Sequence, residues 1–577
     1  MKAINAITLI LLAAAVIFTL IFLFSPGALG ISERGTAYEK YFDSEAVTTV
    51  NITISADEWN DILENPLAEE YHTADIEING DFYSGVGIRT KGMTSLTSVA
   101  SSDSDRYSFR IQADEYVSGQ SFAGLNEFVL NNNYQDPTYM KEFLSYELME
   151  ELDVPTPLHA YAAVYINGEY WGLYLMVEAV EEDFALRSFG ADYGELYKPE
   201  TMNMGGGDRA EGGMPDFGGE FSMPEGFSGT MPNRGGQTGG EFSMPEGFSG
   251  TMPNRGGQTG EEFSMPEGFG RTMPNRGGQT GGEFSMPEGF DGTMPNMGGQ
   301  TGEEFSMPEG FGGVMADFGG FGGFGSGGGA DLVYTDNSIE SYSQIFDNAV
   351  LDGVKDADKK RVIASLKSLA DGENLEAHVD VDEVLRYFAA NTALVNLDSY
   401  VGSFKHNYYL YEEDGKISIL PWDFNLAFGT FQSGDAEGVV NFPIDTPVSE
   451  GTALADRPLI GALLEVSAYK EQYHEYLRYI AEEFFGPSFS SRVAGIDALI
   501  GEYVKTDPTA FSSYAEYQEG LAALNTYEEL RAESIIGQLD GTIPSTHEGQ
   551  KNSTALVNAD SLNMQDLGTM GGGFGGR

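Results

Sequence analysis

Apolar side chains recur along this chain at characteristic spacings, and one of these spacings predicts helices. At residues 138–152 and 381–397 they return every three or four positions, which indicates amphipathic helices. The same spacing predicts further helices in the last third of the chain, at residues 458–485, 491–504 and 513–539.

Other stretches are rich in aromatic and β-branched residues and predict β-hairpins. Within residues 160–178, the dipeptide Asn167-Gly168 separates two such runs, and this dipeptide is a strong signal for a tight turn. Within residues 407–423, the turn falls at 413–415. Strands and helices are mixed at first and only helices follow, so we expect one α+β body.

A 21-residue repeat interrupts this body. The sequence EFSMPEGF begins at Glu220, Glu241, Glu262, Glu283 and Glu304. Each unit contains glycines and prolines but no Leu, Ile or Val, so it cannot bury enough apolar surface to offset the entropy lost on ordering. We therefore predict a disordered insertion at residues 201–330, which divides the body into residues 41–200 and 331–540. The glycine-rich end, residues 541–577, is predicted to be disordered as well.

The first 30 residues are almost entirely apolar, with Lys2 as their only charge. Residues 6–24 hold no charged side chain, and a membrane-spanning helix needs about 20 such residues, whereas a secretory signal uses about 7–15. We therefore expect a single N-terminal transmembrane helix with the body outside the cytoplasm. Cleavage after the small residues Ala28 and Gly30 is the alternative, and it would give a secreted protein.

Composition excludes several classes of function. The chain has 31 Lys+Arg against 89 Asp+Glu, a net charge of −58, so it should repel nucleic acid, which we exclude as a partner. It has no cysteine, which excludes a disulfide scaffold, a thiolate metal site and a cysteine nucleophile. Its six histidines show no paired metal-binding spacing, which argues against a zinc hydrolase.

Polar residues converge at the second predicted hairpin. The helix at 381–397 delivers Asp398 into a loop, and the hairpin places Asn407 and Asp423 at the same end of its two strands. Two carboxylates and an amide oxygen form a site suited to Mg²⁺ or Mn²⁺, and phosphoryl transfer uses such a set. As alternatives, Asp398 caps the following turn and Asp423 bonds its own backbone.

Several segments, taken in order, resemble the CotH family of spore-coat kinases, which are atypical protein kinases. They are GVGIRTKGMTSL, RYSFRI, LNEFVLNNNYQDPTYMKEFLSYELMEEL, VYINGEYWGLYLMVEAVEEDF, GELYKPE, NLDSY, HNYYLY and ILPWDFNLAFG. The resemblance implies a divergent kinase fold that transfers the γ-phosphoryl group of ATP, with Mg²⁺ or Mn²⁺, to Ser/Thr of surface or coat proteins. It implies that Asp398 is the catalytic residue and that Asp423 binds the metal, as the Asp of the kinase DFG motif does. Asn407 would be a second metal ligand.

The sequence departs from ordinary kinases at the nucleotide-binding residues. The first Asn after Asp398 is nine residues on rather than five, and no VAIK motif is present. The candidates to bind phosphate are therefore several basic residues with one tethering glutamate: Arg89, Lys91, Arg106, Arg110, Lys141, Lys198 and Glu178. The alternative for each basic residue is that it is a surface cation that does not bind phosphate.

Two functions remain open at this point. The first is a membrane-anchored protein kinase whose substrates include Ser/Thr-rich proteins and its own repeats, each of which carries a serine. The second keeps the fold but lacks catalysis: a scaffolding protein of a spore coat or cell surface that acts through its repeats.

Overall fold

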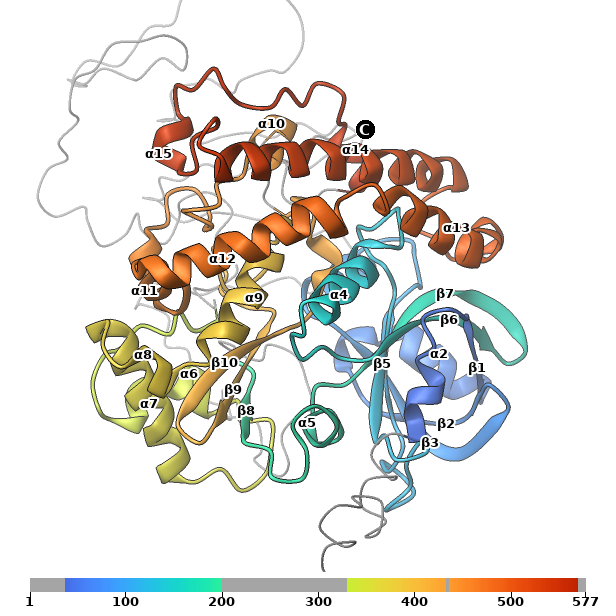
Figure 1. Cartoon of the computed structure of the whole chain (residues 1–577). Helices are drawn as coiled ribbons and strands as arrows, with labels where there is room; N and C mark the ends of the chain where they lie inside the picture. Colours follow the sequence, from blue (N-terminus) through green and yellow to red (C-terminus); the bar gives the residue numbers. More distant parts are fainter. Residues whose placement is uncertain (1–36, 200–328, 432–434, 569–577) are drawn as a thin grey trace, which may run out of the picture. The chain divides into compact units, whose positions relative to one another are not determined.

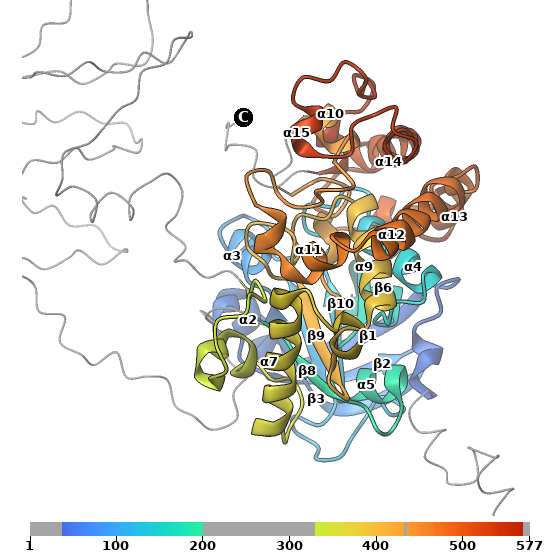
Figure 2. The same ribbon diagram turned by 60° about the vertical axis from the view of Figure 1, so that its left-hand side comes forward.

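A computed structural model describes residues 37–199, 329–431 and 435–568, all of which belong to one compact unit (Figures 1 and 2). The predicted repeat insertion and the predicted N-terminal span lie outside the described residues. The strands are β1 (Thr48–Ile54), β2 (His72–Ile78), β3 (Asp81–Lys91), β4 (Ser108–Gln112), β5 (Glu127–Asn131), β6 (His159–Ile166), β7 (Glu169–Glu178), β8 (Glu195–Tyr197), β9 (Tyr408–Glu413) and β10 (Lys416–Pro421).

The α-helices of the described residues are interspersed with strands up to β10, and only helices follow it. They are α2 (Ala56–Glu64), α3 (Thr94–Ala100), α4 (Lys141–Glu151), α5 (Glu182–Phe189), α6 (Ser343–Phe346), α7 (Asp356–Asp371), α8 (Leu375–His378), α9 (Val381–Ala393), α10 (Ala436–Val440), α11 (Pro458–Leu464), α12 (Ser467–Tyr479), α13 (Phe489–Thr506), α14 (Tyr514–Leu539) and α15 (His547–Gln550).

The first seven strands form a closed barrel in the order β1-β2-β3-β4-β5-β7-β6. Its interior is filled by apolar side chains from alternate strand positions, among them Ile52, Ile88 and Phe109. Our α+β prediction was wrong here, because it included no barrel. The barrel closes through a parallel pairing of β1 with β6, in which Val50 faces Val164, and such a distant pairing leaves no local pattern in the sequence.

The predicted transmembrane helix and the predicted location outside the cytoplasm are corrected as well. Among residues 37–199, 329–431 and 435–568, no helix is long and apolar enough to cross a membrane. The stretch on which we based a membrane-anchored or secreted body, residues 6–24, lies outside these ranges.

Both predicted hairpins are present, and their turns have the expected chemistry. Asn167 and Gly168 have φ values of 52° and 86°, and Asp414 and Gly415 have values of 51° and 90°. Both central residues of each turn thus lie in the left-handed region that a two-residue hairpin turn requires. The second hairpin, β9–β10, carries β8 at its edge, and the three strands lie side by side in Figure 2.

The helices of the second half are fixed by caps and by one buried arginine. The carboxylate of Asp380 accepts a hydrogen bond from the backbone N–H of Glu383 at the start of α9. At the other end of α9, the Arg531 guanidinium of α14 donates to the carbonyl oxygens of Thr392 (2.9 Å) and Ala393 (3.3 Å). A cation at the C-terminal end of a helix is electrostatically favourable, so this contact fixes where α9 ends.

Residues 541–568, which we predicted to be disordered, pack against the helices. The Asn441 side chain exchanges hydrogen bonds of 2.9 Å with the backbone of Val557, and Leu567 is fully buried. A few apolar residues spaced through a polar segment carry this packing, which is too sparse a pattern to predict from sequence.

The outer face of the barrel packs in the apolar core of the helices. The outward-facing residues Val129, Leu175 and Val177 of β5 and β7 pack in the same core as α4 and α9. A buried ion pair adds to this contact, because Arg106 donates to both carboxylate oxygens of Asp507, at 3.0 and 2.9 Å. The outer face of β5 and β7 therefore packs against the helices.

Candidate active site

The loop that follows α9 carries Asp398 and is held by backbone contacts. The Arg457 guanidinium donates to the carbonyl oxygens of Tyr400 (2.7 Å) and Gly402 (2.6 Å). Just before the loop, the Leu394 carbonyl accepts a 2.6 Å hydrogen bond from the backbone N–H of Phe428. The loop of Asp398 is therefore joined directly to the segment that follows Asp423.

Both carboxylate oxygens of Asp398 have a partner. Its Oδ2 accepts a 3.0 Å hydrogen bond from the Asn407 side-chain amide, and its Oδ1 lies 2.5 Å from Nε2 of His406. The side chain is only 9% exposed. The structure thus brings together Asp398 and Asn407, two of the residues that we expected to meet.

Asp423 follows β10 at the same end of the hairpin as Asn407, because Pro421 pairs with Tyr408. Its φ of 59° is unusual for a residue other than glycine and turns the chain sharply after the strand. Its backbone N–H donates to the Tyr146 hydroxyl at 3.1 Å, and that hydroxyl in turn donates to Glu142 at 3.0 Å.

Glu142 connects this loop to the barrel. The Lys91 ammonium, at the end of β3, donates to the side-chain oxygen of Asn131 at 2.9 Å. The amide nitrogen of Asn131 donates to both oxygens of Glu142, at 3.1 and 3.0 Å. A lysine of β3, an asparagine of β5 and a glutamate of α4 therefore form one buried chain of hydrogen bonds.

The protonation of this chain is set by burial and by its neighbours. Burial raises the pKa of Glu142 to about 7; the negative charge of Asp423 raises it too, while Lys91 opposes the rise. Burial lowers the pKa of Lys91, and the carboxylates of Asp423 and Glu142 counteract this. Such opposed shifts are typical of functional sites.

A second lysine lies at the same place. The Nζ atoms of Lys91 and Lys198 lie 5.6 and 5.7 Å from the centre of the Trp422 ring, within the range of cation–π contacts. Both ammonium groups therefore lie beside the same ring, and the positive charge of Lys198 contributes to the lowered pKa of Lys91. Two cations thus lie beside Asp423, as phosphate groups held by a metal ion would require.

The other residues predicted to bind phosphate make contacts elsewhere in the fold. Arg89 bonds Glu69 at 2.6 Å, and Arg110 bonds Glu127 at 2.9 Å. Glu178 is fully buried away from these lysines, where its carboxylate receives hydrogen bonds of 2.6 Å from Tyr38 and Arg187. The remaining two, Arg106 and Lys141, bond Asp507 and Thr430 respectively.

Comparison with known proteins agrees with this geometry. The family described as CotH kinase protein matches residues 88–220 and 327–535, more than half of the chain. The chain belongs to the CotH kinase family. The resemblance noted in its sequence is thus confirmed, and the two matched segments contain Lys91, Glu142, Asp398 and Asp423.

One relative of this CotH protein is the inner spore coat protein H of Bacillus subtilis (strain 168). The two are 35% identical over 78 residues, which cover 14% of this chain and 22% of that protein. The chain therefore matches about a fifth of the length of this relative. The name of the relative describes it as a spore coat protein, and this description concerns the relative alone.

The sequence analysis did not identify Glu142, Asn131 or His406. A signal for Glu142 existed, since it lies among apolar residues of the helix predicted at 138–152, where a glutamate on a buried face needs a partner. Asn131 lies in a run of three asparagines that gives no indication of which one faces the site. The role of His406 depends on a contact that only the folded loop shows.

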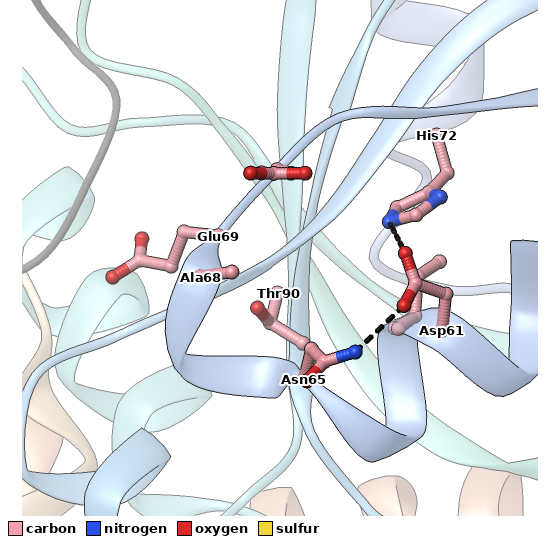
Figure 3. A pocket seen from close by; sticks show the side chains of 8 residues that line it. Asp61, Asn65, Ala68, Glu69, His72 and Thr90 are labelled. Carbon is pink, nitrogen blue, oxygen red and sulfur yellow. Dashed lines mark hydrogen bonds and ion pairs between the residues drawn. The ribbon is translucent and has the colours of Figure 1, made fainter.

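A separate pocket of about 300 Å³ lies on the barrel between α2 and β3. Figure 3 shows Asp61 between Asn65 and His72, which it contacts at 2.7 and 3.6 Å. Glu69 and Glu70 also line this pocket. Its acidic lining is unsuited to nucleotide phosphates, and among the described residues no group of three His, Cys, Asp or Glu could hold a metal ion by itself.

The raised pKa of Glu142 predicts how stability depends on pH. The folded chain binds this proton more tightly than the unfolded chain, so the contribution of Glu142 is full below about pH 4.5 and is lost as pH rises through about 7. Relative to Glu142→Gln, the wild type should lose on the order of 2 kcal/mol of unfolding free energy between pH 5 and 8. Urea unfolding at both pH values measures this.

Glu45→Gln is the control for that measurement, because Glu45 is exposed and the substitution changes the net charge equally. It should follow the wild type at both pH values. If Glu142→Gln also follows the wild type, Glu142 is not buried as described.

Proposed function

We propose that this protein transfers the γ-phosphoryl group of ATP to Ser/Thr hydroxyl groups of coat or surface proteins. The observation that carries the proposal is the hydrogen-bonded chain from Lys91 through Asn131 to Glu142, next to Asp423. Protein kinases use a β3 lysine held by a helix glutamate, together with a metal-binding aspartate. Here an asparagine mediates the contact between lysine and glutamate.

Each residue has a defined task in this reaction. The acceptor hydroxyl oxygen forms a bond to the γ-phosphorus while the bond from that phosphorus to the ADP oxygen breaks. The hydroxyl proton passes to the carboxylate of Asp398. Asp423 and Asn407 would hold Mg²⁺ or Mn²⁺, which neutralises charge on the phosphates. Lys91 and Lys198 bind the phosphate oxygens.

The donor set supports a magnesium site. Asp423 is half-buried just after β10, Asn407 directly precedes β9, and Asp398 in the loop after α9 accepts a hydrogen bond from Asn407. Their carboxylate and amide groups offer oxygen atoms as ligands. Magnesium keeps several waters and takes one or two carboxylates together with substrate phosphates. A complete protein cage is therefore unnecessary, which agrees with the small number of carboxylates at this site.

The nature of the substrate is inferred from relatedness and from the insertion. The coat protein relative supports coat or surface proteins as acceptors. The position of the insertion supports its own serines as acceptors. At the end of the insertion, the backbone N–H of Gly329 donates to the Phe404 carbonyl at 2.6 Å. Gly329 also lies close to Pro199 at the start of the insertion, since a Cβ on Gly329 would be 2.8 Å from the Pro199 carbonyl oxygen. Both ends of the insertion therefore lie next to the loop of His406.

Replacement of Asp423 should impair nucleotide binding, whereas replacement of Asp398 should impair phosphate transfer. Asp423→Ala removes a carboxylate that the metal needs, so it should abolish Mg²⁺-dependent nucleotide binding. Asp398→Ala should bind nucleotide as the wild type does but transfer phosphate about 100-fold or more slowly, because the base acts in the transition state. Calorimetry with an ATP analogue and labelled-phosphate transfer measure the two properties.

Asp43→Ala, at an exposed position outside the site, is the control for both variants. Equal nucleotide affinity in the wild type and in Asp423→Ala would contradict the metal assignment. If the wild type itself transfers no phosphate, a catalytically silent coat scaffold remains.

Substitutions of the basic residues should affect the use of ATP to different extents, depending on what each residue contacts in the fold. Lys91→Met should lower kcat/KM for ATP about 100-fold, because it removes a charge from a site where phosphate charge develops. Arg89→Met should leave KM for ATP close to that of the wild type and lower the melting temperature instead, since it removes the 2.6 Å ion pair with the largely buried carboxylate of Glu69.

Lys198→Met should fall between these two variants, and Lys40→Met, which removes an exposed lysine, should match the wild type. A larger loss of ATP affinity in Arg89→Met than in Lys91→Met would reverse the assignment of the phosphate site.

The repeats should become phosphorylated within the same molecule. The tether raises the effective concentration of each serine at the site to about millimolar, so the rate should not change when the protein is diluted tenfold. Intact-mass analysis after incubation with Mg-ATP should show phosphate in the wild type. A chain with alanine at Ser222, Ser243, Ser264, Ser285 and Ser306 should show less. Phosphate on an added protein with none in the insertion would exclude the repeats as substrates.

A further inference from the structure

Both carboxylate oxygens of Asp398 are engaged by neighbouring side chains in the arrangement that the structure shows. Asn407 donates to its Oδ2, and Nε2 of His406 lies 2.5 Å from its Oδ1. A hydroxyl must approach a base oxygen to about 2.6–3.2 Å to transfer its proton. Because Asn407 belongs to the metal-binding set, Oδ1 is the oxygen that an acceptor would use, and there it meets His406.

His406 lies in a turn that can give up this contact. The residues on each side, Lys405 and Asn407, have φ values of 53° and 54°, in the left-handed region that is strained for residues other than glycine. The His406 side chain is 27% exposed, three times the exposed fraction of the Asp398 side chain. The histidine therefore forms the solvent-facing side of the contact.

An exposed phenylalanine backs the histidine. The Phe404 ring stacks on the His406 ring with a centroid separation of 5.6 Å and an angle of 19° between planes. Phe404 is 41% exposed, although large apolar side chains are usually buried. The Phe404 ring also lies next to that of Phe431, with their centroids 6.0 Å apart. An acceptor that approaches Asp398 from solvent would meet Phe404 and His406 first.

Such a cover would serve a purpose in phosphoryl transfer. Without it, water could act as the acceptor: its oxygen would form a bond to the γ-phosphorus while the bond to the ADP oxygen breaks, and its proton would pass to Asp398. The products are ADP and inorganic phosphate, so ATP would be consumed with nothing phosphorylated. Enzymes of this kind exclude water from the site until the acceptor is bound.

We propose that His406 is a positioning residue that covers Oδ1 of Asp398, suppresses ATP hydrolysis, and is displaced by the acceptor hydroxyl. The proposal rests on the kinase function proposed above. His406 acts through Asp398 and takes no part in the transfer itself.

Two measurements on the full chain test this. Without added acceptor, His406→Ala should release inorganic phosphate from Mg-ATP at least about fivefold faster than the wild type, because water then reaches the base. Free phosphate distinguishes hydrolysis from transfer to the repeats. Independently of turnover, carbodiimide labelling followed by mass spectrometry should modify Asp398 more in His406→Ala than in the wild type.

Matched variants separate the cover from a structural effect. His406→Asn retains a side-chain N–H donor and should restore both properties towards the wild type. Phe404→Ser should raise phosphate release as well, because it removes the ring that backs His406. Phe82→Ser, which changes a 63% exposed phenylalanine of β3, should have no effect.

The outcomes also separate this proposal from the kinase function. If the wild type transfers phosphate but His406→Ala releases no more free phosphate, His406 does not exclude water, and the proposal is overturned while the kinase function stands. If neither chain turns over ATP, the kinase function fails. Equal labelling of Asp398 in both chains then overturns the cover as well, whereas increased labelling supports it.

Discussion

The arrangement of this site depends on one buried interaction, that of Glu142 with Asn131 and Lys91. A carboxylate that is 3% exposed is costly unless it is paired, and here two amide hydrogen bonds, a tyrosine hydroxyl and a nearby ammonium offset part of the cost of its burial. Glu142 belongs to α4 and Lys91 to the barrel, so satisfying this charge fixes the helix against β3 and β5. Through Tyr146 the same glutamate also fixes the backbone of Asp423.

The acidity of the chain gives the lysines their importance. At a net charge of −58, the surrounding field opposes the approach of ATP. Arg89, Arg106 and Arg110 are each bonded to a carboxylate, whereas Lys91 and Lys198 lie over the ring of Trp422. Positive charge is thereby concentrated where phosphate would bind, and a divalent metal at Asp423 would add to it.

The helices and hairpins that depend on short-range patterns could be predicted from the sequence. Helix periodicity located α4 and α9, and Asn-Gly chemistry located the β6–β7 hairpin, because both signals lie within a few residues. The pairing of β1 with β6 joins residues more than a hundred positions apart, and no local pattern reports it. The same holds for the site: one hairpin brought Asn407 and Asp423 to a common end, but Glu142 meets Lys91 only through tertiary packing.

The central claim is that Lys91, Asp398 and Asp423 surround one metal-bound nucleotide. A crystal structure with Mn²⁺ and a non-hydrolysable ATP analogue tests it most directly, because manganese can be located by its anomalous scattering. Manganese should be bonded to the Asp423 carboxylate, with the γ-phosphate between Lys91 and Asp398. Nucleotide bound elsewhere, or manganese without contact to Asp423, would contradict it.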